Sequence, residues 1–367
     1  MYDTFNKYDK LFIMDNIVKM RALVAMSGGV DSSAAVILMK EAGFECIGAT
    51  MKLIANGGSK CCSLEDINDA RNAAWKLEIP HYVLNYTEDF TGRVIEPFIQ
   101  SYENGETPNP CIECNRYLKF SLLLRRALEL EADKLVTGHY ARIEKSGDRW
   151  ILKKGADARK DQSYVLYMMS QKALSHTIFP LGELTKAQAR EIAAAKGLSN
   201  ADKEESQDIC FVDHGDYAGF IESYTGKTYP EGDITDGEGN VLGRHRGLIR
   251  YTLGQRRGTG VALNYPVYVA AKNTADNTLV LGGDSSLYSS SFTARQINLI
   301  ACENIFQPQN LAVKIRYLQK EQPARVEQTG PDTVRVEFEK PQRAITPGQA
   351  AVFYDGDTVV GGGVIEA

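Results

Sequence analysis

The feature that most constrains the fold is the loop SGGVDSS, residues 27–33, together with the apolar segments that flank it. RALVAM at 21–26 is short and apolar, as in a buried strand, and the following SAAVILMKEAG has the length and composition of a helix. CIGATMK at 46–52 then supplies a second strand. A strand, a glycine loop, a helix and a strand in this order predict a βαβ unit built on a parallel sheet.

The same alternation continues to about residue 210 and predicts a doubly wound α/β domain over residues 21–214. A helix is expected through LEDINDARNAAWKLEI, a strand at HYVLNY, a helix over 88–102 and a buried strand at KLVTGHY. Helical spacing also marks the apolar residues after the loop NPCIECN. We expect that last helix to begin after Asn115, with Cys114 just ahead of its N-terminus, where the helix dipole favours a thiolate.

The texture of the sequence changes after this domain. Frequent Gly, Asp and Asn turns, as in EGDITDGEGNVLG, predict a small, mostly β middle domain over residues 215–288. Apolar and charged residues alternate from Val334 to Glu339, and Asp355-Gly356 stands between AVFY and DTVV as a hairpin turn. We therefore predict a C-terminal β-barrel domain over residues 289–367.

Composition limits the setting in which the protein works. Residues 1–20 carry acids and no adequate apolar stretch, so they are expected to be an N-terminal extension rather than a signal peptide. Seven cysteines without a secretory signal favour a reducing compartment and predict a cytoplasmic protein, with Cys46 and Cys302 as buried structural thiols. No apolar run approaches the ~18 residues of a membrane span, so no membrane partner is expected. The net charge of -5 argues against a uniformly basic nucleic-acid binder, but it leaves room for a local basic face.

The residue types of the loop suit a bound phosphate. Gly28 and Gly29 allow positive φ and close approach of the backbone, so that successive N–H groups can surround phosphate oxygens. Ser32 and Ser33 fall in the first turn of the predicted helix, where the dipole favours an anion. Asp31 could hold a phosphate-bound Mg²⁺. The pattern is not the G-x-x-x-x-G-K-[ST] loop of kinases and GTPases, and the alternative is a plain Gly-Gly turn capped by serines.

SGGVDSS after a strand resembles the pyrophosphate loop of ATP pyrophosphatases, which cleave ATP between its α and β phosphates. Seven further segments follow in the order and approximate spacing seen in the tRNA-specific 2-thiouridylase family: NPCIECNRYLKF, TGHYARI, KDQSYVLY, SQDICF, GLIRYTLGQRRG, KIRY and TPGQAAVFY. The resemblance runs from about Ala22 to the C-terminus. It implies ATP-dependent 2-thiolation of the wobble uridine of Lys, Glu and Gln tRNAs. In that reaction ATP adenylates the uracil O2, sulfur is transferred to C2, and AMP and pyrophosphate are released.

The resemblance implies two catalytic cysteines. The residue that matches Cys210 receives a persulfide from a sulfur donor, which is a relay protein or a cysteine desulfurase. The residue that matches Cys114 then releases the outer sulfur, and the cycle ends in a Cys114–Cys210 disulfide that must be reduced. Taken by itself, Cys210 in SQDICF fits better as a buried small hydrophobic residue.

The resemblance also implies binding residues. The positions that match ATP contacts are Ala25, Met26, Ser27, Gly28, Gly29, Val30, Asp31, Ser32, Met51 and Gly138. The positions that match tRNA contacts are Asn109, Pro110, Cys111, His139, Lys160, Asp161, Gln162, Arg316, Tyr317 and Gln349. Taken alone, Met51 is as readily a core methionine, and His139 is more often a loop residue with a structural hydrogen bond.

A separate basic segment, RHRGLIRYTLGQRR at 244–257, holds five arginines and no acid. Guanidinium groups beside glycine turns suit phosphate contacts, which dominate nucleic-acid affinity. A charge run by itself is more often only a solvated face. Because this run stands in an otherwise acidic protein, we expect it to bind tRNA.

The family usually carries an aspartate where this chain has Cys111, so the C-x-x-C pair is a departure, and three interpretations stay open. Cys111 is a bystander beside the uracil site, or Cys111, Cys114 and Cys210 bind three irons of a 4Fe-4S cluster, as in related tRNA thiolases. A zinc site that also uses Cys61 or Cys62 is disfavoured, because vicinal cysteines are awkward ligands and no second C-x-x-C is present.

Two other functions compete with tRNA thiolation. A pyrophosphate-loop ligase or amidotransferase that acts on a small molecule would leave the paired cysteines and the basic segment unexplained. A non-catalytic tRNA-binding protein or thiol redox sensor would not need an intact SGGVDSS loop. Adenylation without tRNA would support the first alternative, and absence of AMP production would support the second.

Overall fold

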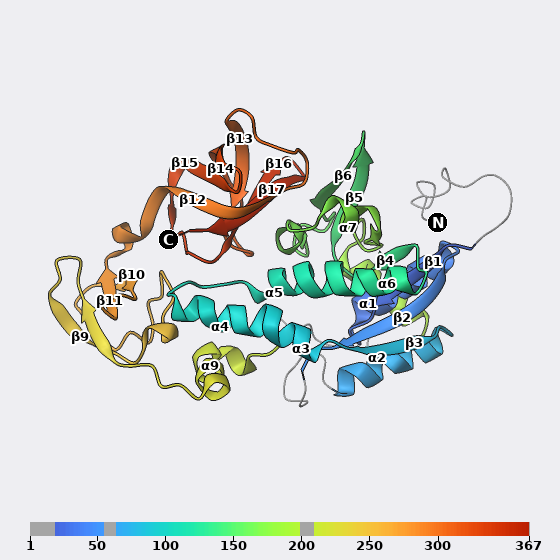
Figure 1. The fold of residues 1–367 in the computed structure, drawn as a ribbon, viewed down its shortest axis with the longest axis horizontal. Coiled ribbons are helices and arrows are strands. Elements are labelled where there is room, and N and C mark those ends of the chain that lie inside the picture. Colours follow the sequence, from blue (N-terminus) through green and yellow to red (C-terminus); the bar gives the residue numbers. More distant parts are fainter. Residues whose placement is uncertain (1–18, 55–63, 199–208, 367) are drawn as a thin grey trace. The chain divides into compact units, whose positions relative to one another are not determined.

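The computed structural model of this chain describes residues 19–54, 64–198 and 209–366 (Figure 1). These residues divide into two compact units. The first unit contains the described parts of Met1–Phe90, Arg116–Ser163 and Ser170–Phe211. The second unit contains Thr91–Asn115, Tyr164–Met169 and the described part of Val212–Ala367. The chain passes between the units more than once, so neither unit is one continuous stretch of sequence.

The core of the first unit is a five-stranded parallel sheet in the order β3-β2-β1-β4-β7. Its strands are β1 (Arg21–Ala25), β2 (Glu45–Lys52), β3 (His81–Asn85), β4 (Lys134–Val136) and β7 (Thr177–Ile178). All its pairings are parallel, and Leu23 lies opposite both Ile47 and Leu135 in the register. The strand order reverses at β1, and α/β sheets bind ligands at the carboxyl ends of the strands at such a reversal. The predicted doubly wound α/β domain is confirmed.

Helices follow the strands of this sheet. They are α1 (Val30–Glu41), α2 (Leu64–Lys76), α3 (Thr87–Phe90), α6 (Leu124–Glu129), α7 (Gln171–Ser175) and α8 (Lys186–Ala195). α1 packs against α8, with Ala34 and Ala189 buried beside Tyr140. Small side chains at this contact let the two helices approach closely just behind the loop that precedes α1. An antiparallel hairpin of β5 (Ala141–Ser146) and β6 (Arg149–Lys154) is an addition to the predicted elements.

The second unit contains the helical segment that carries Cys111 and Cys114. After π-type turns at Thr91–Ile95, the helical elements are α4 (Glu96–Glu103), α5 (Pro110–Glu113) and further π-type turns over Cys114–Leu123, of which the part from Arg116 on belongs to the first unit. Asn109 caps α5, because its Oδ1 accepts a hydrogen bond from the Cys111 N–H at 3.1 Å and Pro110 takes the first helical position. The expected start of this helix after Asn115 is wrong, since the Asn-Pro pair initiates it more than a turn earlier. Cys114 therefore lies within helical backbone rather than ahead of it.

The middle domain lies in the second unit and is a four-stranded sheet in the order β10-β11-β8-β9. Its elements are α9 (Tyr217–Thr225), β8 (Gly232–Thr235), β9 (Val241–His245), β10 (Tyr268–Asn273) and β11 (Thr278–Gly282). The predicted β character is confirmed, and α9 is an addition to it. Asp216 caps α9 by accepting from the Gly219 N–H at 2.9 Å, and Gly226 ends it at φ +65°. Nine residues between these two turn signals are too few for a clear helical period.

The C-terminal domain is a closed β-barrel, as predicted. Its strands are β12 (Tyr288–Leu299), β13 (Gln309–Lys314), β14 (Gln322–Gly330), β15 (Thr333–Arg343), β16 (Ala350–Asp355) and β17 (Thr358–Ile365). β12 pairs with both β15 and β17, which closes the sheet. Val334, Val336 and Phe338 point into the core as their period of two requires. The hairpin loop is one residue later than expected, because Asp355 pairs with Thr358 and leaves Gly356 and Asp357 in the turn.

Several expectations fall on residues that the structure does not describe. Cys61, Cys62 and residues 1–18 lie outside the described ranges. Within those ranges, no helix is both long and apolar enough to cross a bilayer.

A capping box fixes the start of α8. Thr185 Oγ1 accepts from the Gln188 N–H at 3.3 Å, and Gln188 Oε1 accepts from the Thr185 N–H at 2.8 Å. We expect Thr185→Ala to lower the free energy of unfolding by about 1 kcal/mol, because the Gln188 N–H at the helix start loses its acceptor. Urea denaturation measures the change. Thr185→Ser keeps the hydroxyl and should lose far less, and equal losses in both variants would contradict the capping role.

Candidate active site

The loop between β1 and α1 has the backbone of an anion site. Gly28 adopts φ +78°, and a Cβ there would lie 2.4 Å from the carbonyl oxygen of Asp66, so only glycine fits. Gly29 has an ordinary extended backbone at φ -84°. The sequence allowed a positive φ at both glycines, and the structure uses it only at Gly28. The hydroxyls of Ser32 and Ser33 both donate to the Gly29 carbonyl, at 2.9 and 3.3 Å. These contacts hold the first turn of α1, whose leading N–H groups have no intrahelical acceptor.

Asp31 in that turn is bound by two side chains from distant parts of the first unit. Lys186 Nζ donates to both carboxylate oxygens, at 2.8 and 2.7 Å, and the Tyr140 hydroxyl donates to Oδ1 at 2.7 Å. The Lys186 side chain is 10% exposed and that of Asp31 28% exposed, so the ion pair is largely withdrawn from water. An ammonium on both oxygens repels a divalent cation, and the carboxylate therefore does not fit the expected Mg²⁺ in this arrangement.

Gly138 lies directly against the same turn. A Cβ at Gly138 would stand 2.9 Å from the Asp31 carbonyl carbon and 3.0 Å from the Ser32 nitrogen. The position therefore needs glycine, because any larger residue would push the loop away from β4. The structure thus brings Gly138 together with residues 27–33, as the sequence pattern requires, while its contact with ATP stays a prediction. Met51 lies on β2, half-buried, opposite Leu84 of β3.

His139 is buried in an aromatic surrounding. Its Nδ1 shares a 2.7 Å hydrogen bond with the Thr137 hydroxyl, and its ring lies 5.9 Å from Phe120 and 5.7 Å from Phe179 between centroids. Burial, with a smaller contribution from Lys119, lowers the pKa of His139 well below its usual value, so the ring is neutral at pH 7. The hydrogen-bonded loop role accounts for these contacts, and a tRNA contact of His139 stays a prediction.

The segment Lys160–Gln162 supports the loop that carries Tyr140. Gln162 Oε1 accepts from the Tyr140 N–H at 2.9 Å. Asp161 Oδ1 accepts from the N–H groups of Gly155 and Ser163, at 3.0 and 3.1 Å. Two of the three residues matched to tRNA contacts therefore also hold backbone in place, next to the residue that binds Asp31.

In the second unit, the barrel holds the chain that leads into the cysteine segment. Gln349 Nε2 donates to the Thr107 carbonyl at 2.6 Å, and the Thr107 N–H donates to the Pro347 carbonyl at 2.9 Å. Gly348 between them has φ +86°, and a Cβ there would lie 2.9 Å from the Thr107 nitrogen. Gln349 therefore contacts Thr107, which stands two positions before Asn109 in the sequence. Asn109 is the first residue matched to the target uracil.

Arg316 and Tyr317 lie on another loop of the same barrel. Arg316 Nη2 donates to the Ala344 carbonyl at 2.8 Å and to the Thr346 hydroxyl at 2.7 Å, which ties this loop to the one that carries Gln349. Tyr317 is 36% exposed, with its ring 5.9 Å from that of Tyr164. An exposed ring and a guanidinium beside it are the groups that single-stranded RNA recognition uses.

The thiols differ in environment. Cys111 is exposed and Cys114 half-buried in the second unit, while Cys210 is half-buried in the first. Cys46 is buried and its pKa is raised to about 11 by burial, which confirms it as an inert core thiol. Cys302 is only partly buried, against the barrel core.

A bound metal ion or iron-sulfur cluster needs several His, Cys, Asp or Glu side chains grouped around one point. Over residues 19–54, 64–198 and 209–366, no three His, Cys, Asp or Glu side chains are grouped so as to hold a metal ion. Cys111 and Cys114 share one helical segment, and among the described residues no third side chain joins them in such a group. Among the described residues of either unit, the ligand set that a 4Fe-4S cluster or a zinc ion needs is therefore not assembled, and Cys61 and Cys62, on which the zinc alternative draws, lie outside those residues.

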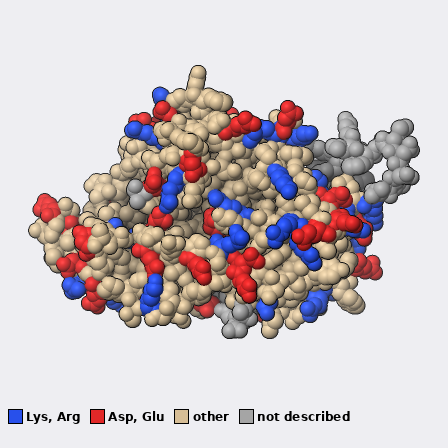
Figure 2. Space-filling model, viewed as in Figure 1, with Lys and Arg blue, Asp and Glu red and all other residues tan. Residues whose placement is uncertain are grey.

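The arginine run is less free than its sequence suggests. Arg244 pairs with Asp233 at 3.0 Å, and Arg250 pairs with Glu222 at 2.6 Å, so acids from elsewhere in the middle domain neutralise two of the five. Arg246, Arg256 and Arg257 form no ion pair with any residue in the described ranges. Figure 2 shows basic and acidic side chains interspersed over one face rather than gathered into a single basic field. The uncompensated positive charge of the run is therefore limited to Arg246, Arg256 and Arg257.

Sequence reasoning missed Lys186 and Tyr140. Tyr140 stands in TGHY, next to two residues that the pattern does single out. Lys186 carried a signal of its own, because it follows the helix-capping Thr185 and so places a cation at the positive end of a helix. Such a lysine needs a compensating anion, but nothing in the sequence says that the anion is Asp31.

Three family models match consecutive parts of the chain. One described as "tRNA methyl transferase HUP domain" covers residues 20–214, one described as "tRNA methyl transferase PRC-barrel domain" covers 218–283, and one described as "Aminomethyltransferase beta-barrel domain" covers 289–365. The first of these matches more than half of the chain and contains the phosphate-type loop.

Curated relatives match over almost the whole length. A protein of Symbiobacterium thermophilum named tRNA-specific 2-thiouridylase MnmA is 47% identical over 95% of this chain and 93% of its own. One of the same name from Lachnoclostridium phytofermentans is 46% identical over 94% of this chain and 99% of its own. Among solved structures, an NMN synthetase from Francisella tularensis reaches a TM-score of 0.37 at 19% identity, over 62% of this chain and 84% of that one. A TM-score this low adds nothing to the fold already described.

The Asp31–Lys186 pair makes a testable contribution to stability. We expect Lys186→Met to lower the free energy of unfolding by about 2 kcal/mol, because it leaves a largely desolvated carboxylate without its cation. Adding Asp31→Asn should recover part of that loss, so that the two effects are not additive. Urea denaturation of the single and double variants measures this coupling.

Lys196→Met, on the other end of α8, is the matched control. Its ammonium lies 3.9 Å from Glu41 and both side chains are about half exposed, so the expected change is within about 0.5 kcal/mol. Simple additivity of Asp31→Asn and Lys186→Met would show that the ion pair contributes nothing.

Proposed function

This chain belongs to the tRNA-specific 2-thiouridylase family, and we propose that it uses ATP to convert the wobble uridine of tRNA to 2-thiouridine. The family-model descriptions speak of a methyl transferase, whereas the curated relatives that share its whole length are named 2-thiouridylases. The observation that carries the proposal is the phosphate-type loop at the N-terminus of α1, in a chain 44–47% identical to those relatives. A small-molecule ligase or a non-catalytic RNA-binding protein would not be expected to keep this match over all three domains.

ATP activates the uracil in this scheme. The uracil O2 attacks the α-phosphorus, the bond to the β-phosphate breaks and pyrophosphate leaves, so that O2 becomes part of a good leaving group. The proposed ATP contacts are residues 25–32 with Met51 and Gly138. Lys186, held at the first turn of α1 by Asp31, is placed to offset negative charge on the departing pyrophosphate. Since Asp31 is already occupied by Lys186, we derive no step through Mg²⁺ at that residue.

Sulfur transfer is proposed to run through Cys210 and Cys114. A persulfide relay protein or a cysteine desulfurase loads a second sulfur on Cys210. That outer sulfur attacks C2, AMP leaves with the former O2, and the Cys114 thiolate attacks Cys210 Sγ to break the S–S bond. The products are 2-thiouridine and a Cys114–Cys210 disulfide, which a dithiol then reduces. The cytoplasm, where such reductants are maintained, is the proposed location.

We propose the persulfide route rather than the cluster, since the unit that holds Cys111 and Cys114 offers no three-ligand set among its described residues. Cys111 is then a neighbour of the target base and not a ligand, and it is grouped with Asn109 and Pro110 as a proposed uracil contact. The remaining proposed tRNA contacts are His139, Lys160–Gln162, Arg316, Tyr317 and Gln349. Two of these, Arg316 and Gln349, come from loops of the barrel that hydrogen bonds tie together and to Thr107.

Serine substitutions test the cysteine pair. We expect Cys114→Ser and Cys210→Ser each to abolish 2-thiouridine formation on an unmodified tRNA transcript, because a hydroxyl can neither carry nor release the outer sulfur. Mass spectrometry of digested tRNA measures the product. Cys302→Ser, a partly buried thiol of the barrel, is the control and should keep the wild-type yield. Retained activity in either Cys114→Ser or Cys210→Ser would refute the sulfur-transfer scheme.

Iron content distinguishes the two roles of Cys111. We expect anaerobically purified protein to contain far less than one iron per chain and to thiolate tRNA from a persulfide donor, and Cys111→Ser to keep that activity. About four irons per chain, with activity lost on chelation and in Cys111→Ser, would establish the cluster instead. Iron and acid-labile sulfide are measured on the same sample as thiolation.

A further inference from the structure

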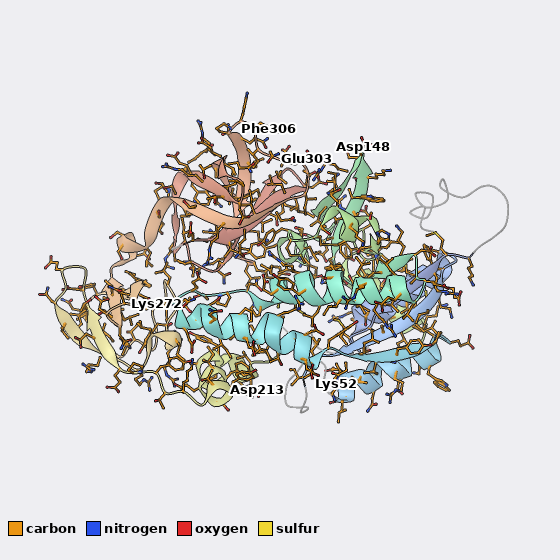
Figure 3. The ribbon with its side chains drawn as sticks, viewed as in Figure 1. Lys52, Asp148, Asp213, Lys272, Glu303 and Phe306 are labelled. Carbon is orange, nitrogen blue, oxygen red and sulfur yellow. The ribbon has the colours of Figure 1, made fainter. Side chains whose placement is uncertain are left out.

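A long connection in the middle domain, residues 252–267, has a firmly held base. We call it the middle loop. The Gly254 N–H donates to the Val269 carbonyl at 2.8 Å, and the Val269 N–H donates to the Gln255 carbonyl at 2.9 Å. Lys272 of β10, labelled in Figure 3, donates to the Tyr251 carbonyl at 3.0 Å just before the loop begins. The loop is therefore built on the sheet rather than loosely attached to it.

The Gln255 side chain shapes the first turn of the middle loop. Its Oε1 accepts from the Thr252 N–H at 3.0 Å, and its Nε2 donates to the Arg257 carbonyl at 2.9 Å. Gly258 and Gly260 follow with φ near +80°, and between them Thr259 is buried. This backbone leaves the next side chains on the surface.

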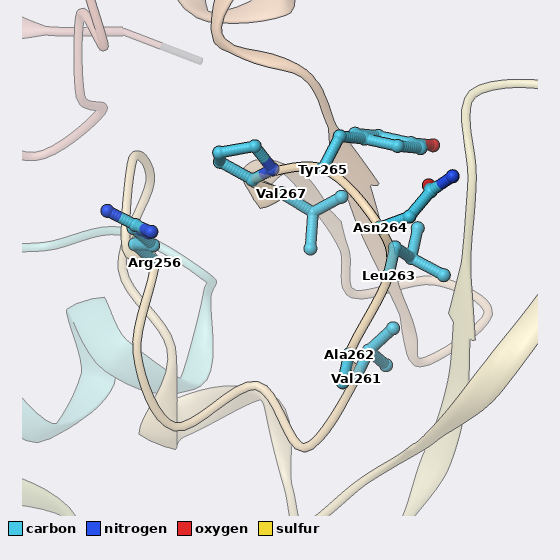
Figure 4. A pocket seen from close by; sticks show the side chains of 8 residues that line it. Arg256, Val261, Ala262, Leu263, Asn264, Tyr265 and Val267 are labelled. Carbon is cyan, nitrogen blue, oxygen red and sulfur yellow. The ribbon is translucent and has the colours of Figure 1, made fainter.

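The outer part of the middle loop forms a shallow pocket of about 340 Å³ (Figure 4). The residues that line it are Arg256, Val261, Ala262, Leu263, Asn264, Tyr265, Pro266 and Val267. Tyr265 is 54% exposed and Leu263 is 38% exposed, in positions where no core packing requires them. An exposed ring, a guanidinium and a side-chain amide around one hollow are the groups that bind a splayed nucleobase.

The positive charge around the middle loop favours a nucleic acid, with its phosphate backbone, as the binding partner over a protein surface of mixed charge. Residues 239–275 contain no Asp or Glu, and Arg256 and Arg257 form no ion pair with any residue of the described chain. Guanidinium groups without acidic partners are available to phosphates, and each phosphate that is neutralised releases counterions. The neighbouring Arg244 and Arg250, which are paired with acids, lack that freedom.

The middle loop is also continuous with the barrel loops that are proposed to bind tRNA. A Cβ on Gly254 would lie 3.0 Å from the Cβ of Ala344, so the loop base packs on that residue. The Ala344 carbonyl is the acceptor of the Arg316 guanidinium. A single RNA that contacts Arg316 can therefore extend onto the middle loop.

From these observations we infer that the middle loop is a second tRNA subsite. An unpaired base from outside the anticodon arm stacks on Tyr265 in the pocket, and Arg256 and Arg257 bind the phosphates beside it. The inference rests on the proposed function, because it takes tRNA as the substrate. It adds a contact with the tRNA body that a short anticodon stem–loop does not make.

Binding of two RNAs tests this subsite: an unmodified full-length tRNA transcript with uridine at the wobble position, and the 17-nucleotide anticodon stem–loop of that tRNA. We expect Tyr265→Ala to weaken binding of the full-length transcript about tenfold, and Tyr265→Phe to keep it, because stacking needs the ring and not the hydroxyl. Arg256→Ala should weaken it several-fold and reduce the slope of log K against log salt by about one. None of these three variants should change binding of the stem–loop.

Tyr288→Ala is the matched aromatic control, at 48% exposure on β12, and Arg325→Ala is the arginine control, exposed on β14. Full-length affinity within twofold of wild type in both middle-loop variants overturns the inference, as does an equal loss for the stem–loop. If the middle-loop variants bind both RNAs normally but receive sulfur from the donor more slowly, the inference is also overturned, and the middle loop is then a binding site for the donor protein. Thiolation of the stem–loop by wild-type protein tests the proposed function separately, so the two failures are distinguishable.

Discussion

The ion pair between Asp31 and Lys186 is the contact on which the site of the first unit depends. It joins the first turn of α1 to the start of α8 across 155 positions of sequence, and Tyr140 adds the loop after β4. Because both charges are largely withdrawn from water, removing Lys186 leaves the Asp31 carboxylate desolvated and without its cation. The pair therefore holds the phosphate-type loop in one shape before a nucleotide binds. Under the proposed function, the same ammonium lies where charge on the departing pyrophosphate must be offset.

In the second unit, hydrogen bonds between the barrel and Thr107 position the cysteine segment. The barrel closes on itself and so has no free edge, which makes it a rigid support. Through Gln349 and Pro347 it holds Thr107, and through Thr107 it sets the path of the chain into the cap of the cysteine helix. Gln349 and Arg316 are thus both occupied by protein groups. To contact RNA as proposed, they must share or exchange these bonds, so base recognition and the position of the cysteine segment are linked.

Charge shows why a sequence run and a surface are different things. The five arginines between residues 244 and 257 have no acid among them, yet the fold brings Asp233 to Arg244 and Glu222 to Arg250. Of the five, only Arg246, Arg256 and Arg257 form no ion pair with a described acid and so are available to a partner. In a chain with net charge -5, affinity for a polyanion must come from such local groups. The middle loop combines two of them with an exposed ring, which the linear sequence does not distinguish from its neighbours.

Local patterns in the sequence were sufficient for the architecture. The strand, glycine loop and helix around SGGVDSS, and the alternation at Val334, Val336 and Phe338, predict the parallel sheet and the barrel, because burial periodicity and turn chemistry act over a few residues. The helix start at Pro110 and the short α9 were missed, since their signals are single caps rather than periods. The tertiary structure alone decided that Lys186 meets Asp31, that Gln349 meets Thr107 and that Arg256 stays without an acid. Pairing across 155 or 242 positions depends on how the elements pack, and no local propensity encodes it.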